Sequence, residues 1–283
     1  MNAVELAQKS SDLFTLPDVY MKLQKLIRKP QTSIDDIAEL ISIDAALTAR
    51  LLKIANSSFY SFPAEVGTIS RAINLIGTDQ LMSLILATSV AGSFSGVPAE
   101  VIDMDSFWRH NVDTALLARA LAGACKQPDI ERLFVAGLLH NVGKLIALTE
   151  MPDQSLQALL LEEDERPWQK QSEVLGFTFA ECGAELLSVW ELPSSLINTV
   201  RFQHMPGLAG DDELSAALLN IASRAASAME QETCATEGPE YLALIDEQCW
   251  DLTGLHTTDL DVSMAYAQEE AWNMLGIISA AVY

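Results

Sequence analysis

Three of the four histidines in this 283-residue chain lie near or within apolar segments that have helical spacing. They are His110, His140 and His204. His140 stands in the phrase AGLLHNVGKL, one turn before Lys144. Side chains on separate helices of one bundle can converge in its core, and imidazole is a common ligand of zinc, iron and manganese. The three histidines are therefore either satisfied core residues or parts of one site.

The residue after His140 indicates whether a hydrolytic metal site is expected here. A hydrolytic metal site needs hard anionic oxygen beside imidazole, and a carboxylate at this position would supply it. Asn141 stands there instead. Its amide oxygen is neutral, binds metal weakly and cannot act as a base. His110 and His140 are thus weak candidates for metal binding, and no metal ligand is expected at Asn141.

The segments that carry these residues show helical periodicity. His110 falls in a helix predicted over about 106–125, and His140 in another over about 129–149. The N-terminal third also reads as helices, separated by Pro, Gly and capping residues. No segment with strand periodicity is long enough to build a sheet. The sequence predicts an all-α chain in which two helical sub-bundles pack together, followed by a helical C-terminal extension.

Composition limits the classes of partner. Hydrophobic residues make up 49% of the chain and the net charge is −22. Such a charge repels phosphate backbones and anionic lipid, so neither direct nucleic-acid binding nor membrane-surface binding is expected. No Lys or Arg follows Arg224, whereas eleven Asp or Glu do. This acidic end is either a solvated face or a docking surface for a basic partner.

The lack of a secretory signal and the spacing of the cysteines predict a cytoplasmic protein. The first residues, MNAVELAQKSSDLF, lack the apolar core of a secretory signal. The longest apolar run, LMSLILATSVAGSF, is shorter than the roughly 18 residues that a membrane span needs. The four cysteines have no CxxC spacing, which favours reduced thiols over a zinc site or a disulfide framework.

Several phrases resemble a known family. FWRH, followed thirty residues later by GLLHNVGKL, looks like the HD superfamily of metal-dependent phosphohydrolases. LFTLPDVYMKLQKLI, ALTARLLKIANSSFY and TISRAINLIGTDQL resemble the HDOD family more specifically, the HD-related output domain of bacterial signalling proteins. The resemblance covers about residues 10–225. It implies a single HDOD-type unit with an N-terminal sub-bundle over 1–100, an HD-like sub-bundle over 101–230 and an acidic extension over 231–283.

The resemblance can be carried over residue by residue. His110 and His140 match the two histidines of the HD pattern, and Lys144 matches the Lys that ends its second phrase. Asn141 stands where the pattern has a metal-binding Asp, and Ser223, in NIASRAA, stands where it has the distal Asp. Two anionic ligands are therefore missing. These five residues, with His204, form the expected vestigial pocket.

The HDOD family generally lacks these ligands and is thought to act by binding. The resemblance thus implies a non-catalytic regulatory module in bacterial signal transduction that binds a signalling protein or a small ligand. No catalytic residue or cofactor is expected. The alternative is a metal-dependent phosphohydrolase acting on nucleotides or phosphodiesters with a single divalent metal, and a third interpretation is nucleotide binding without cleavage. His140 and Asn141 are expected to bond to one another and to backbone, because an unpaired buried amide costs about 1–3 kcal/mol.

A candidate interaction surface lies in the N-terminal part. Asn56, Ser57, Phe59 and Tyr60 leave a predicted helix as a polar and aromatic loop. Aromatic side chains beside hydrogen-bonding residues suit protein interfaces, but they suit packing on the core equally well. Both interpretations remain open.

Overall fold

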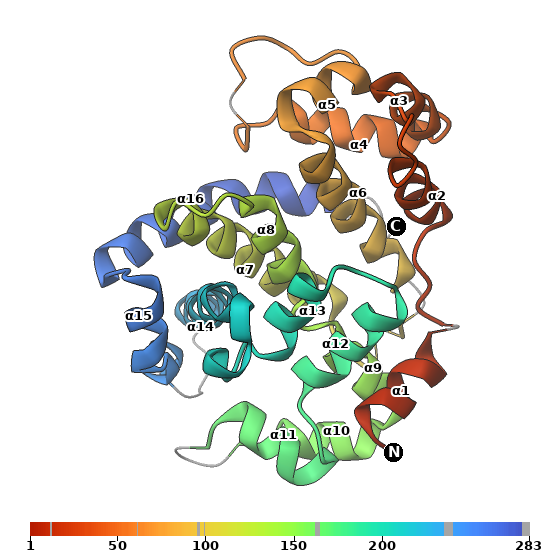
Figure 1. The fold of residues 1–283 in the computed structure, drawn as a ribbon. Helices are drawn as coiled ribbons and strands as arrows, with labels where there is room; N and C mark the ends of the chain where they lie inside the picture. The colour runs from red at the N-terminus through yellow and green to blue at the C-terminus, as the bar shows by residue number, and fades with distance from the viewer. Residues whose placement is uncertain are drawn as a thin grey trace. The chain divides into compact units, whose positions relative to one another are not determined.

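The computed structural model describes residues 1–11, 13–60, 62–94, 97–98, 100–161, 165–234 and 240–278, with the backbone alone for 232–234. These residues form helices joined by short connections and contain no strand, which confirms the all-α prediction (Figure 1). The sixteen α-helices found in them are α1 (Ala3–Ser10), α2 (Asp18–Ile27), α3 (Ile34–Ser42), α4 (Ala45–Ala55), α5 (Ile69–Ile76), α6 (Thr78–Ser93), α7 (Met104–Ala124), α8 (Ile130–Leu139), α9 (Val142–Glu150), α10 (Pro152–Ala158), α11 (Pro167–Leu175), α12 (Phe179–Val189), α13 (Ser194–Arg201), α14 (Glu213–Cys234), α15 (Glu247–Thr253) and α16 (Thr257–Ile278).

The helices group into two compact units. The first unit comprises Met1–Leu13 and Val97–Glu269, and the second comprises Phe14–Gly96 and Glu270–Tyr283. The sequence places residues 1–100 together, yet α1 packs against α9 and α12 of the first unit. Helix periodicity predicts which face of a helix is apolar. It does not predict which other helix, near or distant in the sequence, covers that face.

The second unit contains α2 to α6. Capping residues set several of its helix starts: Ser33 and Asp36 form a capping box at α3, and the side chains of Asp44 and Thr68 accept backbone N–H bonds at α4 and α5. Gly77 separates α5 from α6 with a φ of 96°, a conformation that favours glycine. α6 is buried over much of its circumference, as its nearly continuous apolar sequence predicts.

Two long helices of the first unit, α7 and α14, pack against each other. α7 packs against both α8 and α14, and α12 packs against α9, α13 and α1 (Figure 1). The segment Ile130–Glu150 is long and apolar enough to span a membrane, but 78% of its most apolar window is buried inside the fold. Its apolarity is therefore accounted for by core packing.

The predicted helix over 129–149 is two helices, α8 and α9, separated at His140 and Asn141. Two bonds replace those of a continuous helix. The Nδ1–H of His140 donates to the Gly137 carbonyl at 2.6 Å, and the amide of Gln203 donates to the His140 carbonyl at 3.1 Å. The Lys144 N–H then donates to the Asn141 carbonyl. At the break, the His140 side chain and Gln203, 63 positions away, form these hydrogen bonds.

Three helices, α1, α10 and α11, lie in segments for which no individual helix was predicted. α1 begins with a capping box formed by Asn2 and Glu5. α11 begins at Pro167. Proline at the first helical position is compatible with a helix because the missing N–H has no intrahelical partner there. Because Pro167 follows a run of charged residues, the sequence around it is more typical of a loop than of a helix start.

Glycines allow two pairs of helices to approach closely. A Cβ at Gly137 of α8 would lie within 3.0 Å of Ala115 backbone atoms in α7. A Cβ at Gly143 of α9 would lie within 3.0 Å of the Phe179 carbonyl oxygen and the Gly183 nitrogen in α12. These contacts hold the helices that carry His110, His140 and Lys144 in fixed positions.

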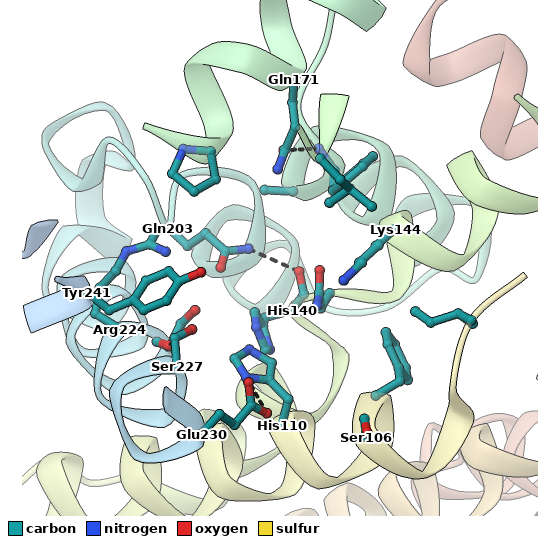
Figure 2. Close-up of a pocket in the computed structure, with 18 of the residues that line it drawn as sticks. Ser106, His110, His140, Lys144, Gln171, Gln203, Arg224, Ser227, Glu230 and Tyr241 are labelled. Atoms are coloured by element: carbon teal, nitrogen blue, oxygen red, sulfur yellow. Dashed lines mark hydrogen bonds and ion pairs between the residues drawn. The ribbon is translucent and has the colours of Figure 1, made fainter. Parts of the chain in front are cut away.

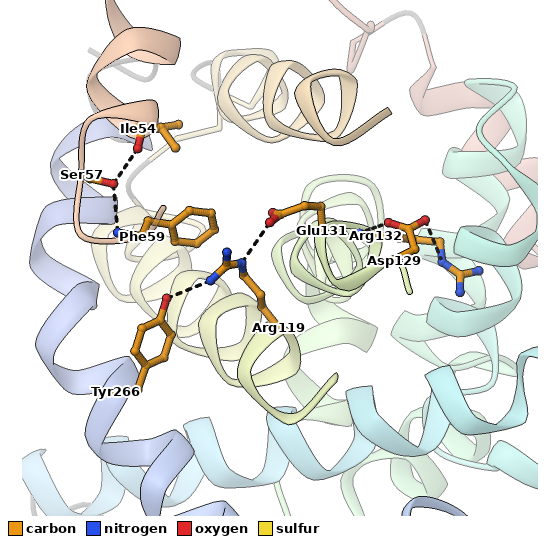
Figure 3. A network of polar contacts seen from close by, with 8 residues as sticks. All are labelled: Ile54, Ser57, Phe59, Arg119, Asp129, Glu131, Arg132 and Tyr266. Carbon is orange, nitrogen blue, oxygen red and sulfur yellow. Dashed lines mark hydrogen bonds and ion pairs between the residues drawn. The ribbon is translucent and has the colours of Figure 1, made fainter. Parts of the chain in front are cut away.

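A buried charge network links α7, α8 and α16 (Figure 3). The Arg119 Nε lies 3.1 Å from Oε1 of Glu131, whose side chain is only 3% exposed. The Arg119 Nη1 also donates to the Tyr266 hydroxyl oxygen at 3.1 Å. A buried ion pair is costly to break because one charge then remains in a poorly solvating environment.

Candidate functional site

A cavity of about 590 Å³ lies within the first unit. All six residues of the expected vestigial pocket line it: His110, His140, Asn141, Lys144, His204 and Ser223. They come from α7, the α8–α9 junction, α9, the segment after α13, and α14. The cavity has the size of ordinary small-ligand sites, which are roughly 300–1,000 Å³. The fold thus brings these residues together, while their use as a binding site stays a prediction.

His110 and His140 lie side by side at the cavity (Figure 2), with ring centroids 5.2 Å apart. Because a carbonyl can only accept, His140 carries its proton on Nδ1 when it donates to Gly137. Burial, followed by the charges of His110, Arg224 and Lys144, lowers the pKa of His140 well below its ordinary value. His140 is therefore a neutral imidazole at pH 7, with its Nε2 lone pair available.

Asn141 does not follow the expected pattern. It forms no side-chain hydrogen bond at the start of α9, and none joins it to His140 in the described part of the chain. The side chain is half-buried and lines the cavity. The expectation of a His140–Asn141 bond was wrong, because the His140 ring turns back toward the Gly137 carbonyl. The Asn141 amide is left available to a ligand or water.

His204 belongs to a second cluster at the same cavity. Its ring stacks on that of Trp168 with centroids 4.8 Å apart and planes 7° apart. An Nη2–H of Arg224 donates to His204 Nδ1 at 2.9 Å, so the neutral His204 carries its proton on Nε2. Burial and the neighbouring Arg224 charge lower the pKa of His204 well below its ordinary value.

Arg224 and Trp168 were missed by sequence reasoning. Arg224 is only 5% exposed, and its guanidinium carbon lies 4.5 Å from the Trp168 ring centroid. Burial lowers its pKa to about 10, so the side chain remains charged at pH 7. A usable signal was present: Arg224 is the one basic residue in the helical run ELSAALLNIASRAASAM and the last in the chain. Trp168 offered no such signal.

Two carboxylates line the cavity, Asp103 and Glu230. Asp103 caps α7 by accepting from the backbone of Asp105 and Ser106. Glu230 Oε1 lies 3.2 Å from His110 Nδ1. Within the described residues, no group of three or more His, Cys, Asp or Glu side chains is arranged to hold a metal ion.

The loop residues proposed as an interaction surface lie in the second unit. Asn56 donates to the carbonyls of Leu52 and Val66 and accepts from the Val66 N–H, so its amide organises the loop. Phe59 is buried at 4% exposure, which agrees with the alternative that it folds back onto the core. Ser57 and Tyr60 are half-buried. A partner contact through this loop remains a prediction.

A family comparison identifies the domain that most of this chain forms. The model of the HDOD domain matches residues 13–206, which is more than half of the chain. The chain belongs to the HDOD family. Ser223 and Arg224 lie beyond the matched residues. The assignment of Ser223 to the distal position therefore rests on the NIASRAA phrase and on its place in the cavity.

Solved structures have the same fold. This HDOD protein is 25% identical to a candidate phosphohydrolase from Shewanella amazonensis SB2B, with a TM-score of 0.74 and coverage of 96% and 97% of the two chains. An HDOD domain protein of unknown function from Geobacter sulfurreducens is 21% identical, with a TM-score of 0.68 and coverage of 99% and 98%. A candidate signal transduction protein from Marinobacter aquaeolei VT8 is 21% identical, with a TM-score of 0.70 and coverage of 96% and 61%.

A curated relative adds little on function. An uncharacterized protein of Treponema pallidum (strain Nichols) is 29% identical over 205 residues, which are 71% of this chain. Those residues span 39% of the relative's own length.

Proposed function

We propose that this HDOD protein is a non-catalytic regulatory module of bacterial signal transduction. It acts in the cytoplasm by binding a signalling protein or a small ligand. The observation that carries the proposal is the chemistry of two cavity positions. Asn141 and Ser223 are neutral where the HD pattern has carboxylates, so the cavity offers little anionic oxygen to hold a metal and activate water. The description of the Marinobacter neighbour as a candidate signal transduction protein points in the same direction.

The pairing of the remaining groups supports the same proposal. A divalent ion shared by His110 and His140 would need a carboxylate close by. Glu230 already pairs with His110, and Asp103 caps α7. The described residues therefore fit a resident metal poorly.

A metal-dependent phosphohydrolase is the second candidate. The 5.2 Å between the His110 and His140 rings favours it, because two imidazoles at this separation could face one ion. The Shewanella neighbour is described as a candidate phosphohydrolase, and it has the same fold over nearly the whole chain. Its substrates would be nucleotides or phosphodiesters.

An activity assay separates the two candidates. We expect the purified protein to hydrolyse neither a generic phosphodiester nor nucleotides above background with added manganese, because no described group activates a water. Turnover that depends on manganese and disappears in His140→Ala would overturn the regulatory proposal. His256→Ala is the matched control, since His256 is exposed and does not line the cavity.

A second test restores the missing charge. Asn141→Asp and Ser223→Asp would each add a hard anionic ligand at the cavity that holds His110 and His140. Each single variant leaves the ligand set incomplete, so its melting temperature should change little with manganese. The double variant should gain stability with manganese, since an ion that binds only the folded state stabilises it by about 2.7 kcal/mol at 100 times its Kd.

Thermal melts with and without manganese measure this effect. A rise in the double variant alone supports the assignment of Asn141 and Ser223 to the two missing ligands. An equal rise in wild type would show that the natural side chains already bind the metal. No rise in either protein would show that these four positions do not converge on one ion.

A further inference from the structure

The cavity is lined by three cationic side chains, Arg109, Lys144 and Arg224, and by two carboxylates, Asp103 and Glu230. Arg109 pairs with Asp113, whereas Lys144 and Arg224 form no ion pair among the described residues, in a chain whose net charge is −22. Figure 2 shows Lys144 on one side of His140, and Arg224 with Tyr241 on the other. Two cations held at one cavity of so acidic a protein require a reason, because charged side chains are rarely buried without a partner.

Arg224 is the more costly of the two. It is 5% exposed, and its Nη2 donates to the neutral His204. Its Nε has no hydrogen-bond partner among the described residues. In the described part of the chain, no carboxylate forms an ion pair with it. The nearby titratable groups are Tyr241, Cys249 and Arg166. Burial raises the pKa of both Tyr241 and Cys249, so neither supplies negative charge at pH 7.

Lys144 is half-buried, and its side chain makes no hydrogen bond to the residues that the structure describes. The opposite charge that acts on it is Glu230, which is also the partner of His110. His140 and His204 remain neutral beside these cations and add no counter-charge. Of the two cavity carboxylates, Asp103 caps α7, so Glu230 is the carboxylate near both Lys144 and His110.

Uncharged donors stand beside the cations. The Asn141 amide lines the cavity and has no partner at the start of α9 among the described residues. Tyr241 lines the cavity beside Arg224 (Figure 2). Cations together with amide and hydroxyl donors are the groups that bind phosphate and carboxylate oxygens. The volume of about 590 Å³ accommodates a small molecule that carries such a group.

We infer that this cavity binds a small oxyanion, the phosphate or carboxylate group of a metabolite-sized ligand, between Arg224 and Lys144 without a metal ion. The inference rests on the proposed function, since it names the chemical class of ligand to which the regulatory module responds. The neutral side chains of Asn141 and Ser223 then favour the binding of an anion. They stand in place of two carboxylates that would repel the anion, and Asn141 adds an amide donor.

The test uses inorganic phosphate as the probe, with malonate as a carboxylate arm. Binding to the full chain is measured by calorimetry and thermal melts in EDTA, at constant ionic strength against chloride. We expect saturable phosphate or malonate binding. Lys144→Gln should weaken it at least about tenfold, because it removes a charged hydrogen-bond donor. Arg224→Gln should weaken it similarly, and Lys126→Gln should leave it unchanged since Lys126 is exposed and outside the cavity.

The two arms identify the source of the oxyanion. Binding of phosphate alone indicates a phosphorylated ligand, and binding of malonate alone indicates a carboxylate. Should Arg224→Gln fail to fold, Lys144→Gln decides the matter, because its side chain has no hydrogen bond to lose. Failure of both anions to bind beyond chloride would overturn the inference, as would equal binding by wild type and Lys144→Gln. Manganese-dependent hydrolysis would overturn the proposed function instead, and it is read in a separate assay.

Discussion

Replacing Gly143 with alanine is expected to destabilise this HDOD protein by about 3 kcal/mol. The new Cβ would lie within 3.0 Å of the Phe179 carbonyl oxygen and the Gly183 nitrogen. These are backbone atoms of α12, so no side chain can rotate away to make room. α9 must instead move away from α12, and the packing between two buried helices is lost along their contact.

Urea unfolding of the purified variant measures the change in free energy. Gly123→Ala is the matched control, because Gly123 is also helical but a Cβ there meets nothing within 4 Å. The control should gain up to about 1 kcal/mol, since alanine has the better helix propensity. Equal unfolding midpoints for the two variants would show that α9 and α12 are not held in close contact at Gly143.

Removing the charge of Arg119 is expected to have an effect of similar size. Arg119→Met leaves the Glu131 carboxylate, 3% exposed, without its ion pair, and it also removes the bond to Tyr266. Loss of one partner of a buried pair costs about 3–5 kcal/mol. We expect the lower end of this range, because the Arg119 side chain retains 14% exposure and water can reach part of the network.

The double variant Arg119→Met with Glu131→Met separates charge from packing. It should recover most of the lost stability, because two apolar side chains of similar length replace the pair and no charge stays buried. Lys9→Met is the surface control: Lys9 pairs with Glu150 but is 56% exposed, and such pairs contribute about 0–1 kcal/mol. A double variant no more stable than Arg119→Met would show that the geometry of the network, and not its charge, stabilises the first unit.

The stability of the first unit bears directly on the cavity. His110 is on α7, Lys144 on α9 and Arg224 on α14, so each cavity group depends on helix contacts that Gly137, Gly143 and Arg119 help to set. A ligand that draws Arg224 and Lys144 together would act on α14 and α9 at once. Such coupling between elements is what a binding module needs to pass on a signal.

The sequence by itself determined the fold class and the family. Helical periodicity and capping residues such as Ser33 and Thr178 act locally, so they can be read without knowledge of distant contacts. The family resemblance grouped His110 and His140 with Asn141, Lys144 and Ser223, and His204 was added as a third histidine near an apolar helical segment. All six line one cavity.

Tertiary structure alone decided where helices break and which charges are buried. The His140 carbonyl at the α8–α9 break bonds to the distant Gln203, and the neutral state of His140 depends on its burial, so neither follows from residues near 140. The sequence marks Arg224 only as the one basic residue of its helical run and the last in the chain. Its significance comes from desolvation and from the absence of a carboxylate partner among the described residues, and both are properties of the space around a side chain that local sequence does not specify.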